Sequence, residues 1–208
     1  MNYFFQGLTV ALASIAPIGV QNLFVINSAM SLPLVRALAV AVAVFTFDMS
    51  LTLGAFFGMG SLISAFPLVK NAVLLIGSLF VLRVGFGLIL SPAKELEREE
   101  RAFSLKKAIV TAFVVTWFNP QALIDTTLFF GAFRASLPAP AVRPFIAGCL
   151  TASPLWFVSI TLIVSAMKQR LGAGFLRALN IVCRVVLSLL LREVFKFFIE
   201  SHSSFIIK

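Results

Sequence analysis

The sequence has 208 residues, of which 60% are hydrophobic and only 12% are charged, and its formal net charge is +9. A chain with so few polar residues cannot coat a water-soluble globule, so its composition excludes a soluble domain and indicates an integral membrane protein. The apolar segments are long enough to cross about 30 Å of hydrocarbon and lack the alternation of barrel strands, which predicts an all-α helix bundle.

Six apolar segments predict six transmembrane helices, at about 3–27, 37–60, 68–90, 108–133, 143–166 and 177–199. The sixth is the weakest because charged residues interrupt it, namely Arg184, Arg192, Glu193 and Lys196. A five-span chain whose C-terminal helix lies on the membrane surface is the alternative. In both cases the chain, 1–208, forms a single transmembrane domain.

The first segment contains "APIGVQN", residues 16–22, where a lipid-facing helix would be uniformly apolar. Pro17 removes a backbone donor, and Gly19 lets the backbone approach a ligand or a neighbouring helix, so we expect a broken helix here. Gln21 and Asn22 follow the break and are candidates for a polar site within the membrane.

The second segment carries Asp48, in "VFTFDMSLTLG", many residues from either loop. A carboxylate at that depth costs about 2.5 to 3.5 kcal/mol on insertion scales, so we expect it inside the bundle. It could bind a cation, exchange a proton or pair with Arg83 or Arg184, and the sequence leaves these three roles open. The same holds for Asp125 in the fourth segment.

A polar stretch of mixed charge, "SPAKELEREERAFSLKK" at about 91–107, separates the third and fourth segments. We interpret it as a solvated cytoplasmic linker with some helical character.

The fourth segment repeats the interruption of the first, in "TWFNPQALID", residues 116–125. Pro120 lies 103 positions after Pro17 in a chain whose half-length is 104, and a polar residue follows each proline by five positions, Asn22 and Asp125 respectively. This pattern predicts a second broken helix.

The offset of 103 also carries Asp48 onto Thr151, which extends the repeat to three helices. A repeated unit with an odd number of spans enters the membrane from opposite sides in its two copies. The sequence therefore predicts two inverted repeats, at about 1–90 and 108–200, with helices 1 and 4 broken and a binding site where the repeats meet near the midplane.

Basic residues are distributed unequally between the two predicted faces. The loops after the first, third and fifth segments hold nine, and the opposite face holds four: Arg36, Lys94, Arg98, Arg101, Lys106, Lys107, Lys168, Arg170 and Arg177 against Lys70, Arg134, Arg143 and Lys208. Because cytoplasmic loops are enriched in Lys and Arg, we expect both termini in the periplasm. The positive charge thus reflects membrane topology, and we expect lipid rather than nucleic acid as its partner.

The sequence lacks the usual signals of catalysis. Cys149 and Cys183 both lie in predicted spans without metal or redox spacing, and no intramembrane histidine or Ser–Lys pair is evident. We therefore expect no enzyme activity, no catalytic residue, no metal site and no cofactor.

In combination, these motifs resemble a known family. "APIGVQNLFVIN", Asp48, "TWFNPQALIDTTLFFGAF" and "TASPLWF" are similar to the LysE family of amino-acid exporters, and most similar to its arginine-exporter branch. The resemblance covers about residues 4–182. Two positions depart from it: Val20 stands where the family often has a second proline, and Arg184 stands where small or apolar residues are usual.

The resemblance implies export of L-arginine, or of L-lysine and related cationic amino acids, across a bacterial inner membrane. The substrate head would meet free N–H groups at the broken-helix ends and the side chains of Gln21, Asn22 and Asn119.

The cationic end of such a substrate would be held by Asp48 and Asp125, and Trp117 could stack on a guanidinium or simply pack against lipid or protein. The sequence contains no nucleotide-binding loop, so the driving force is an ion gradient or the membrane potential. Because that potential retains cations at about 2.3 kcal/mol per charge per 100 mV, we expect exchange with protons carried by Asp48 or Asp125.

Other cargoes remain as alternatives, namely neutral amino acids or a divalent metal cation, although two carboxylates are few ligands for a hard cation. The sequence leaves open the preference between arginine and lysine, the coupling ratio and the oligomeric state, a homo-oligomer included.

Overall fold

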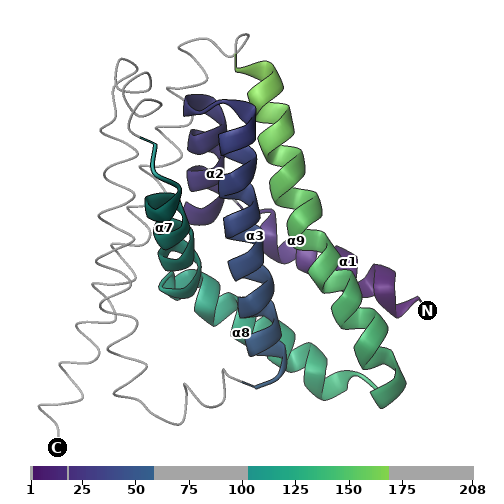
Figure 1. The fold of residues 1–208 in the computed structure, drawn as a ribbon. Coiled ribbons are helices and arrows are strands. Elements are labelled where there is room, and N and C mark those ends of the chain that lie inside the picture. Colours follow the sequence, from purple (N-terminus) through teal and green to yellow (C-terminus); the bar gives the residue numbers. More distant parts are fainter. Residues whose placement is uncertain (1, 18, 59–102, 169–208) are drawn as a thin grey trace, which may run out of the picture.

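The computed structural model describes residues 2–17, 19–58 and 103–168, and within them the chain forms six α-helices (Figure 1). The predicted spans at 68–90 and 177–199, together with Arg83 and Arg184, lie outside the described residues. So do most of the predicted linker and Cys183.

The first predicted segment forms two helices rather than one. α1 (Tyr3–Ile15) ends before Pro17, and α2 (Val20–Ser31) begins after Gly19 at an angle of 79° to α1. α2 continues four residues beyond the predicted end of this segment at residue 27, because no residue before Leu32 interrupts its hydrogen bonding.

The second predicted segment forms α3 (Leu34–Phe56), which begins three residues earlier than expected. The helix begins directly after Pro33, which is its N-cap. The φ of Pro33 is −58° and its ψ is 148°, so the backbone is extended at this residue and helical after it.

The fourth predicted segment also forms two helices, α7 (Leu105–Trp117) and α8 (Pro120–Ser136), separated by Phe118 and Asn119. α7 begins inside the predicted linker because Ser104 caps it, its hydroxyl accepting a hydrogen bond from the backbone N–H of Lys107 at 3.5 Å. α8 begins with Pro120, which is favoured at the first position of a helix because its missing N–H has no partner there.

The fifth predicted segment is α9 (Ala139–Met167), a helix of 29 residues with Pro144 and Pro154 in its interior. α3 and α9 are each long and apolar enough to cross a membrane, and α1 with α2 would pass as one bent span. The exposed faces of these helices carry large apolar side chains, including Val35, Val42, Leu155 and Ile163, as expected for surfaces in contact with lipid.

Two apolar clusters form the core. One lies among the C-terminal part of α2, the first part of α3, the first part of α7 and the last part of α9. The other lies among α1, the end of α3, α8 and the first part of α9. Between the two clusters, the buried residues of α3 include Asp48 and Thr52 and those of α9 include Ser153, so a layer of polar side chains lies between the clusters.

The helices run in alternate directions past this polar layer. In Figure 1, α2 leads away from the first break toward the start of α3, whereas α8 leads away from the second break toward the start of α9, at the other end of the molecule. The N-termini of α2 and α8 therefore face the polar layer from opposite sides.

α1 lies across α9, and the two backbones meet at a pair of glycines. A Cβ atom at Gly7 would overlap the backbone oxygen of Phe145, and one at Gly148 would overlap that of Phe4. The thiol of Cys149 donates a hydrogen bond of 3.4 Å to the carbonyl of Gly7 at the same crossing. Close approach of small residues is the usual way in which membrane helices pack.

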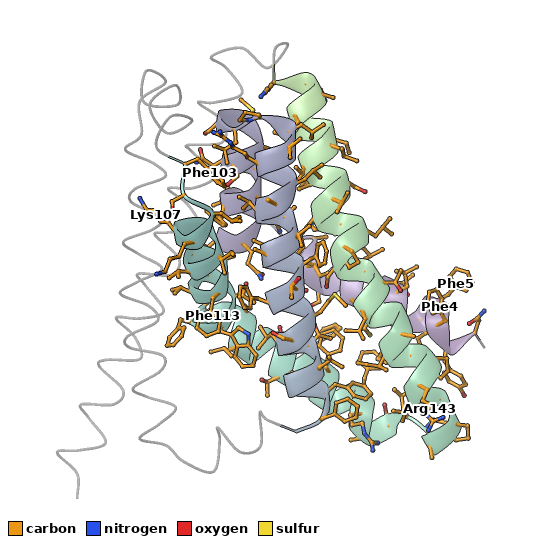
Figure 2. The ribbon with its side chains drawn as sticks, viewed as in Figure 1. Phe4, Phe5, Phe103, Lys107, Phe113 and Arg143 are labelled. Atoms are coloured by element: carbon orange, nitrogen blue, oxygen red, sulfur yellow. The ribbon has the colours of Figure 1, made fainter. Side chains whose placement is uncertain are left out.

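Most of the described basic residues lie at one end of the bundle. Figure 2 shows Phe103 and Lys107 near the start of α7 and Arg143 at the opposite end, near the start of α9. By their places in the helices, four basic residues belong to the first end and two to the second: Arg36, Lys106, Lys107 and Lys168 against Arg134 and Arg143. The Arg36 guanidinium lies 5.6 Å from the ring centroid of Phe103.

Candidate functional site

The polar layer brings together side chains from five of the described helices. Each is buried or partly buried in the apolar bundle: Gln21 and Asn22 of α2, Asp48 of α3, Thr116 of α7, Asn119 at the start of α8, and Ser153 and Trp156 of α9. Four of these residues, Gln21, Asn22, Asp48 and Asn119, are among those that the sequence predicts for the site.

Asp48 belongs to this layer and is 8% exposed. Its Oδ2 accepts a hydrogen bond from the Ser153 hydroxyl at 2.5 Å, and its Oδ1 accepts a long one from the Gln21 amide at 3.5 Å. Both partners are neutral, and within the described part of the chain no cationic group pairs with this carboxylate. A cation from elsewhere would complete its surroundings, because a buried charge needs a counter-charge.

Gln21 connects the two breaks. Besides its contact with Asp48, its amide donates a hydrogen bond of 2.8 Å to the Thr116 hydroxyl, one turn before the second break. That hydroxyl in turn donates to the carbonyl of Ala112 at 2.8 Å, so it acts as both an acceptor and a donor. The start of α2 is therefore held beside the end of α7.

Asn22 stabilises the first break. Its amide nitrogen donates to the carbonyls of Ile15 and Pro17, at 2.8 and 2.9 Å, which the interrupted helix leaves without helical partners. Its amide oxygen accepts from the Trp156 indole at 2.9 Å. In this conformation both amide hydrogens of Asn22 are therefore bound to protein carbonyls, and its role in substrate binding stays a prediction.

The first turns of α2 and α8 lack side-chain caps. The N-cap of α2 is Gly19, and no atom of a packing neighbour lies within 4 Å of the position that a Cβ would occupy there. Among the described residues, no neighbouring atom fills the space beside the Gly19 Cα atom, so this space is open to a ligand. Uncapped N–H groups and the helix dipole make both helix starts favourable for an anionic group.

Asn119 is the N-cap of α8, and it is 6% exposed. An asparagine at this position usually accepts a hydrogen bond from the first turn of the helix. Here it makes no such bond, and its Oδ1 is buried without any hydrogen-bond partner. Only one other side-chain atom in the described residues shares that condition, the Oε1 of Gln6.

The remaining predicted residues have different surroundings. Trp117 is partly buried, and its indole donates to the Ser50 hydroxyl at 3.0 Å, so its polar edge faces α3. Pro17 is exposed in the connection between α1 and α2. Pro120 and Asp125 lie in α8, and their side chains lie outside what the structure describes.

Sequence reasoning missed Thr116, Ser153 and Trp156. The internal repeat pointed instead to Thr151 as the counterpart of Asp48, but Thr151 is exposed and bonds to the carbonyl of Ala147 in its own helix. Ser153, two residues later, is the α9 residue that reaches Asp48. Both Ser153 and Trp156 belong to the motif "TASPLWF", but no pattern in the sequence indicates which residues they contact.

No group of three or more histidine, cysteine or carboxylate residues gathers within the described ranges. The polar layer instead offers a carboxylate, amide groups and hydroxyls, beside two helix starts. This donor and acceptor set suits a small zwitterion with an additional positive charge better than a bare metal ion.

Comparisons with known proteins agree with this chemistry. Residues 12–191 match the LysE type translocator family. The chain is 33% identical over 190 residues to the arginine exporter protein ArgO of Klebsiella pneumoniae, which covers 89% of each chain. It is 32% identical over 195 residues to ArgO of Salmonella schwarzengrund, covering 91% of this chain and 92% of that one. No solved structure matches the chain.

Proposed function

The chain belongs to the LysE family of translocators, and from that premise we propose that it exports cationic amino acids, L-arginine above all, in exchange for protons. As a member of this family it is a multi-pass membrane transporter of amino acids and not an enzyme. Its similarity to the arginine exporter ArgO, which aligns with this chain over about nine-tenths of its length, supports arginine as the cargo.

The observation that carries this proposal is the state of Asp48. A carboxylate buried among helices, with only Ser153 and Gln21 as described partners, favours a cargo that brings its own positive charge. A guanidinium can bind a carboxylate through two parallel hydrogen bonds, which makes arginine a strong partner for such a group. A neutral amino acid would bring no positive charge to this carboxylate. Asp125, on α8, is the second carboxylate that we assign to cation binding or proton exchange.

The α-carboxylate of the substrate would lie at the uncapped helix starts. α2 and α8 face the polar layer from opposite sides, and the Gln21–Thr116 hydrogen bond holds the two breaks close together. This arrangement supports the interpretation of the chain as two inverted repeats that meet at a substrate site.

Proton exchange follows from the energetics of the cargo. A cation leaving a negative interior works against about 2.3 kcal/mol per 100 mV, and one proton entering for each monovalent cation removes that electrical cost. We assign the proton to Asp48 or Asp125, which the substrate cation would displace.

We also propose that the protein lies in a bacterial inner membrane with both termini in the periplasm. The four basic residues at the Lys107 end of the bundle favour that end as the cytoplasmic one. Single cysteines test this in a background without Cys149 and Cys183. In spheroplasts, an impermeant maleimide should label Ser136→Cys, and it should label Ser104→Cys only after lysis. The reverse pattern would overturn the orientation.

Efflux from intact cells tests the function itself. Cells loaded with an arginine-containing dipeptide should release arginine faster when they express the chain, and collapsing the proton gradient should remove the difference. Asp125→Asn should abolish this release at unchanged protein abundance, because removing a charge from the membrane interior does not hinder insertion. Release of leucine instead of arginine would favour the neutral amino-acid alternative.

A further inference from the structure

The buried oxygen of Asn119 is an acceptor that the protein leaves unused. Buried side-chain oxygens in folded proteins almost always have a partner, so one that lacks a partner calls for an explanation. Asn119 is only 6% exposed, and the backbone N–H groups in the first turn of α8, the usual partners of an N-cap oxygen, do not donate to it. A ligand that supplies an N–H or O–H donor would satisfy it.

The neighbouring groups have the opposite preference. The start of α8 presents backbone N–H groups and the positive end of the helix dipole, both of which attract an anion. An acceptor oxygen and an anion-binding helix start, side by side, are complementary to an ammonium and a carboxylate borne on one carbon atom. An α-amino acid has this arrangement, whereas a simple amine or a simple carboxylic acid has only half of it.

We propose that the Oδ1 of Asn119 accepts a hydrogen bond from the α-ammonium group of the transported amino acid, while its α-carboxylate lies at the start of α8. This inference rests on the proposed function, and it adds an orientation: the head of the substrate lies at the second break and its cationic side chain points toward Asp48. Asn119 then determines specificity for α-amino acids over compounds with the same side chain.

The consequence is a specific pattern of discrimination among arginine analogues. 5-Guanidinopentanoate lacks only the α-amino group of arginine, and agmatine lacks only its carboxylate. Loss of a hydrogen bond to a charged group weakens binding by roughly tenfold to a hundredfold, so wild-type protein should bind 5-guanidinopentanoate that much more weakly than arginine. In Asn119→Leu that difference should largely disappear, whereas the difference between arginine and agmatine should persist.

The experiment measures inhibition of labelled arginine uptake into inside-out membrane vesicles that contain the full chain, by each of the three unlabelled compounds. Because Asn119 makes no cap hydrogen bond, Asn119→Leu removes an acceptor without breaking a bond of the protein. Gln6→Leu is the matched control, since it removes the other unpartnered buried oxygen, nine residues before the end of α1, and should leave both ratios unchanged.

Asn119→Asp provides a second variant in case the leucine variant does not insert. It retains acceptor oxygens, so it should keep or increase discrimination against 5-guanidinopentanoate, and loss of discrimination in it would overturn the inference. If Asn119→Leu changed the agmatine ratio instead, Asn119 would bind the carboxylate, and the proposed orientation would be wrong. Absence of any arginine uptake by wild-type protein would overturn the proposed function, whereas normal uptake with unchanged ratios in Asn119→Leu would overturn this inference alone.

Discussion

The two helix breaks differ in how completely the protein satisfies their polar groups. At the first break, the Asn22 side chain binds the freed carbonyls of Ile15 and Pro17 and is itself bound by Trp156. At the second, the Asn119 side chain has no cap bond and a buried oxygen without a partner.

The difference teaches that a proline break inside a membrane can have either of two functions. At the first break the side chain of Asn22 binds two of the freed carbonyls, which fixes the bend between α1 and α2. A break that keeps groups free retains binding capacity for something else. Each half of the chain has an asparagine near a proline, but the asparagine binds freed carbonyls at the first break and has an unpartnered oxygen at the second.

The largest effect should come from Asp48, which lies between the two breaks and contacts Gln21 of the first. Asp48→Asn should reduce arginine export by a hundredfold or more at normal abundance, because the charge that holds the cargo or the proton is gone. Efflux rates at matched expression measure it. Thr151→Ala, which loses only a bond within its own helix, serves as the control, and export near wild type in Asp48→Asn would remove this residue from the mechanism.

A large loss of stability should follow from Asn22→Ala, and not from Asn119→Leu. The alanine removes three hydrogen bonds and leaves two carbonyls and an indole N–H without partners, a loss of roughly 2 to 4 kcal/mol at about 1 kcal/mol per bond. Asn119→Leu removes none. Thermal unfolding of the purified variants in detergent measures the contrast, and equal destabilisation of the two would contradict the distinction between the breaks.

A smaller destabilisation is expected for Trp156→Phe, which deletes one of the three bonds of Asn22 and leaves its oxygen buried without a donor. We expect about 1 to 2 kcal/mol, with a slower transport step, because α9 then no longer fixes the bend. Ser165→Ala is the control: it deletes a bond from α9 to the carbonyl of Ala29 in α2, away from the break. If the two variants had the same transport rate, the Trp156 bond would have no special role in positioning α2.

The smallest effect on stability should come from Gly19→Ala. The backbone φ of −109° is ordinary for any residue, and a Cβ there would meet no packing neighbour within 4 Å. The change in unfolding free energy should therefore be within about 0.5 kcal/mol. A raised KM for arginine without loss of stability would indicate that the ligand approaches this backbone, and a large loss of stability would show that the space beside Gly19 is filled.

Within the described residues, the sequence was sufficient to predict the long apolar helices and the places where they are interrupted. Hydropathy located α3 and α9 to within a few residues, and the interruptions at Pro17 and Pro120 follow from the chemistry of proline. The helix ends were less accurate because Pro33 and Ser104 start helices by local hydrogen bonding and dihedral angles that hydropathy does not report.

The partners within the site could not be predicted, because they depend on contacts between distant segments. Serine and threonine in helices commonly bond to the carbonyl four residues earlier, as Thr111 and Thr151 do. Nothing in the sequence distinguishes these from Ser153, which reaches Asp48 across the bundle. Likewise, Asn22 and Asn119 are both asparagines near a proline, and the sequence does not show that Asn22 contacts Trp156, 134 residues away, whereas the oxygen of Asn119 has no partner.

The glycine crossing of α1 and α9 has a consequence for genetics. The atoms that exclude a side chain at Gly7 and Gly148 are the backbone oxygens of Phe145 and Phe4, not parts of their side chains. Replacing either phenylalanine with a smaller residue therefore creates no room, since every amino acid carries the same carbonyl. Loss-of-function alleles at these glycines should yield revertants at the same codon but no second-site suppressors at positions 4 and 145.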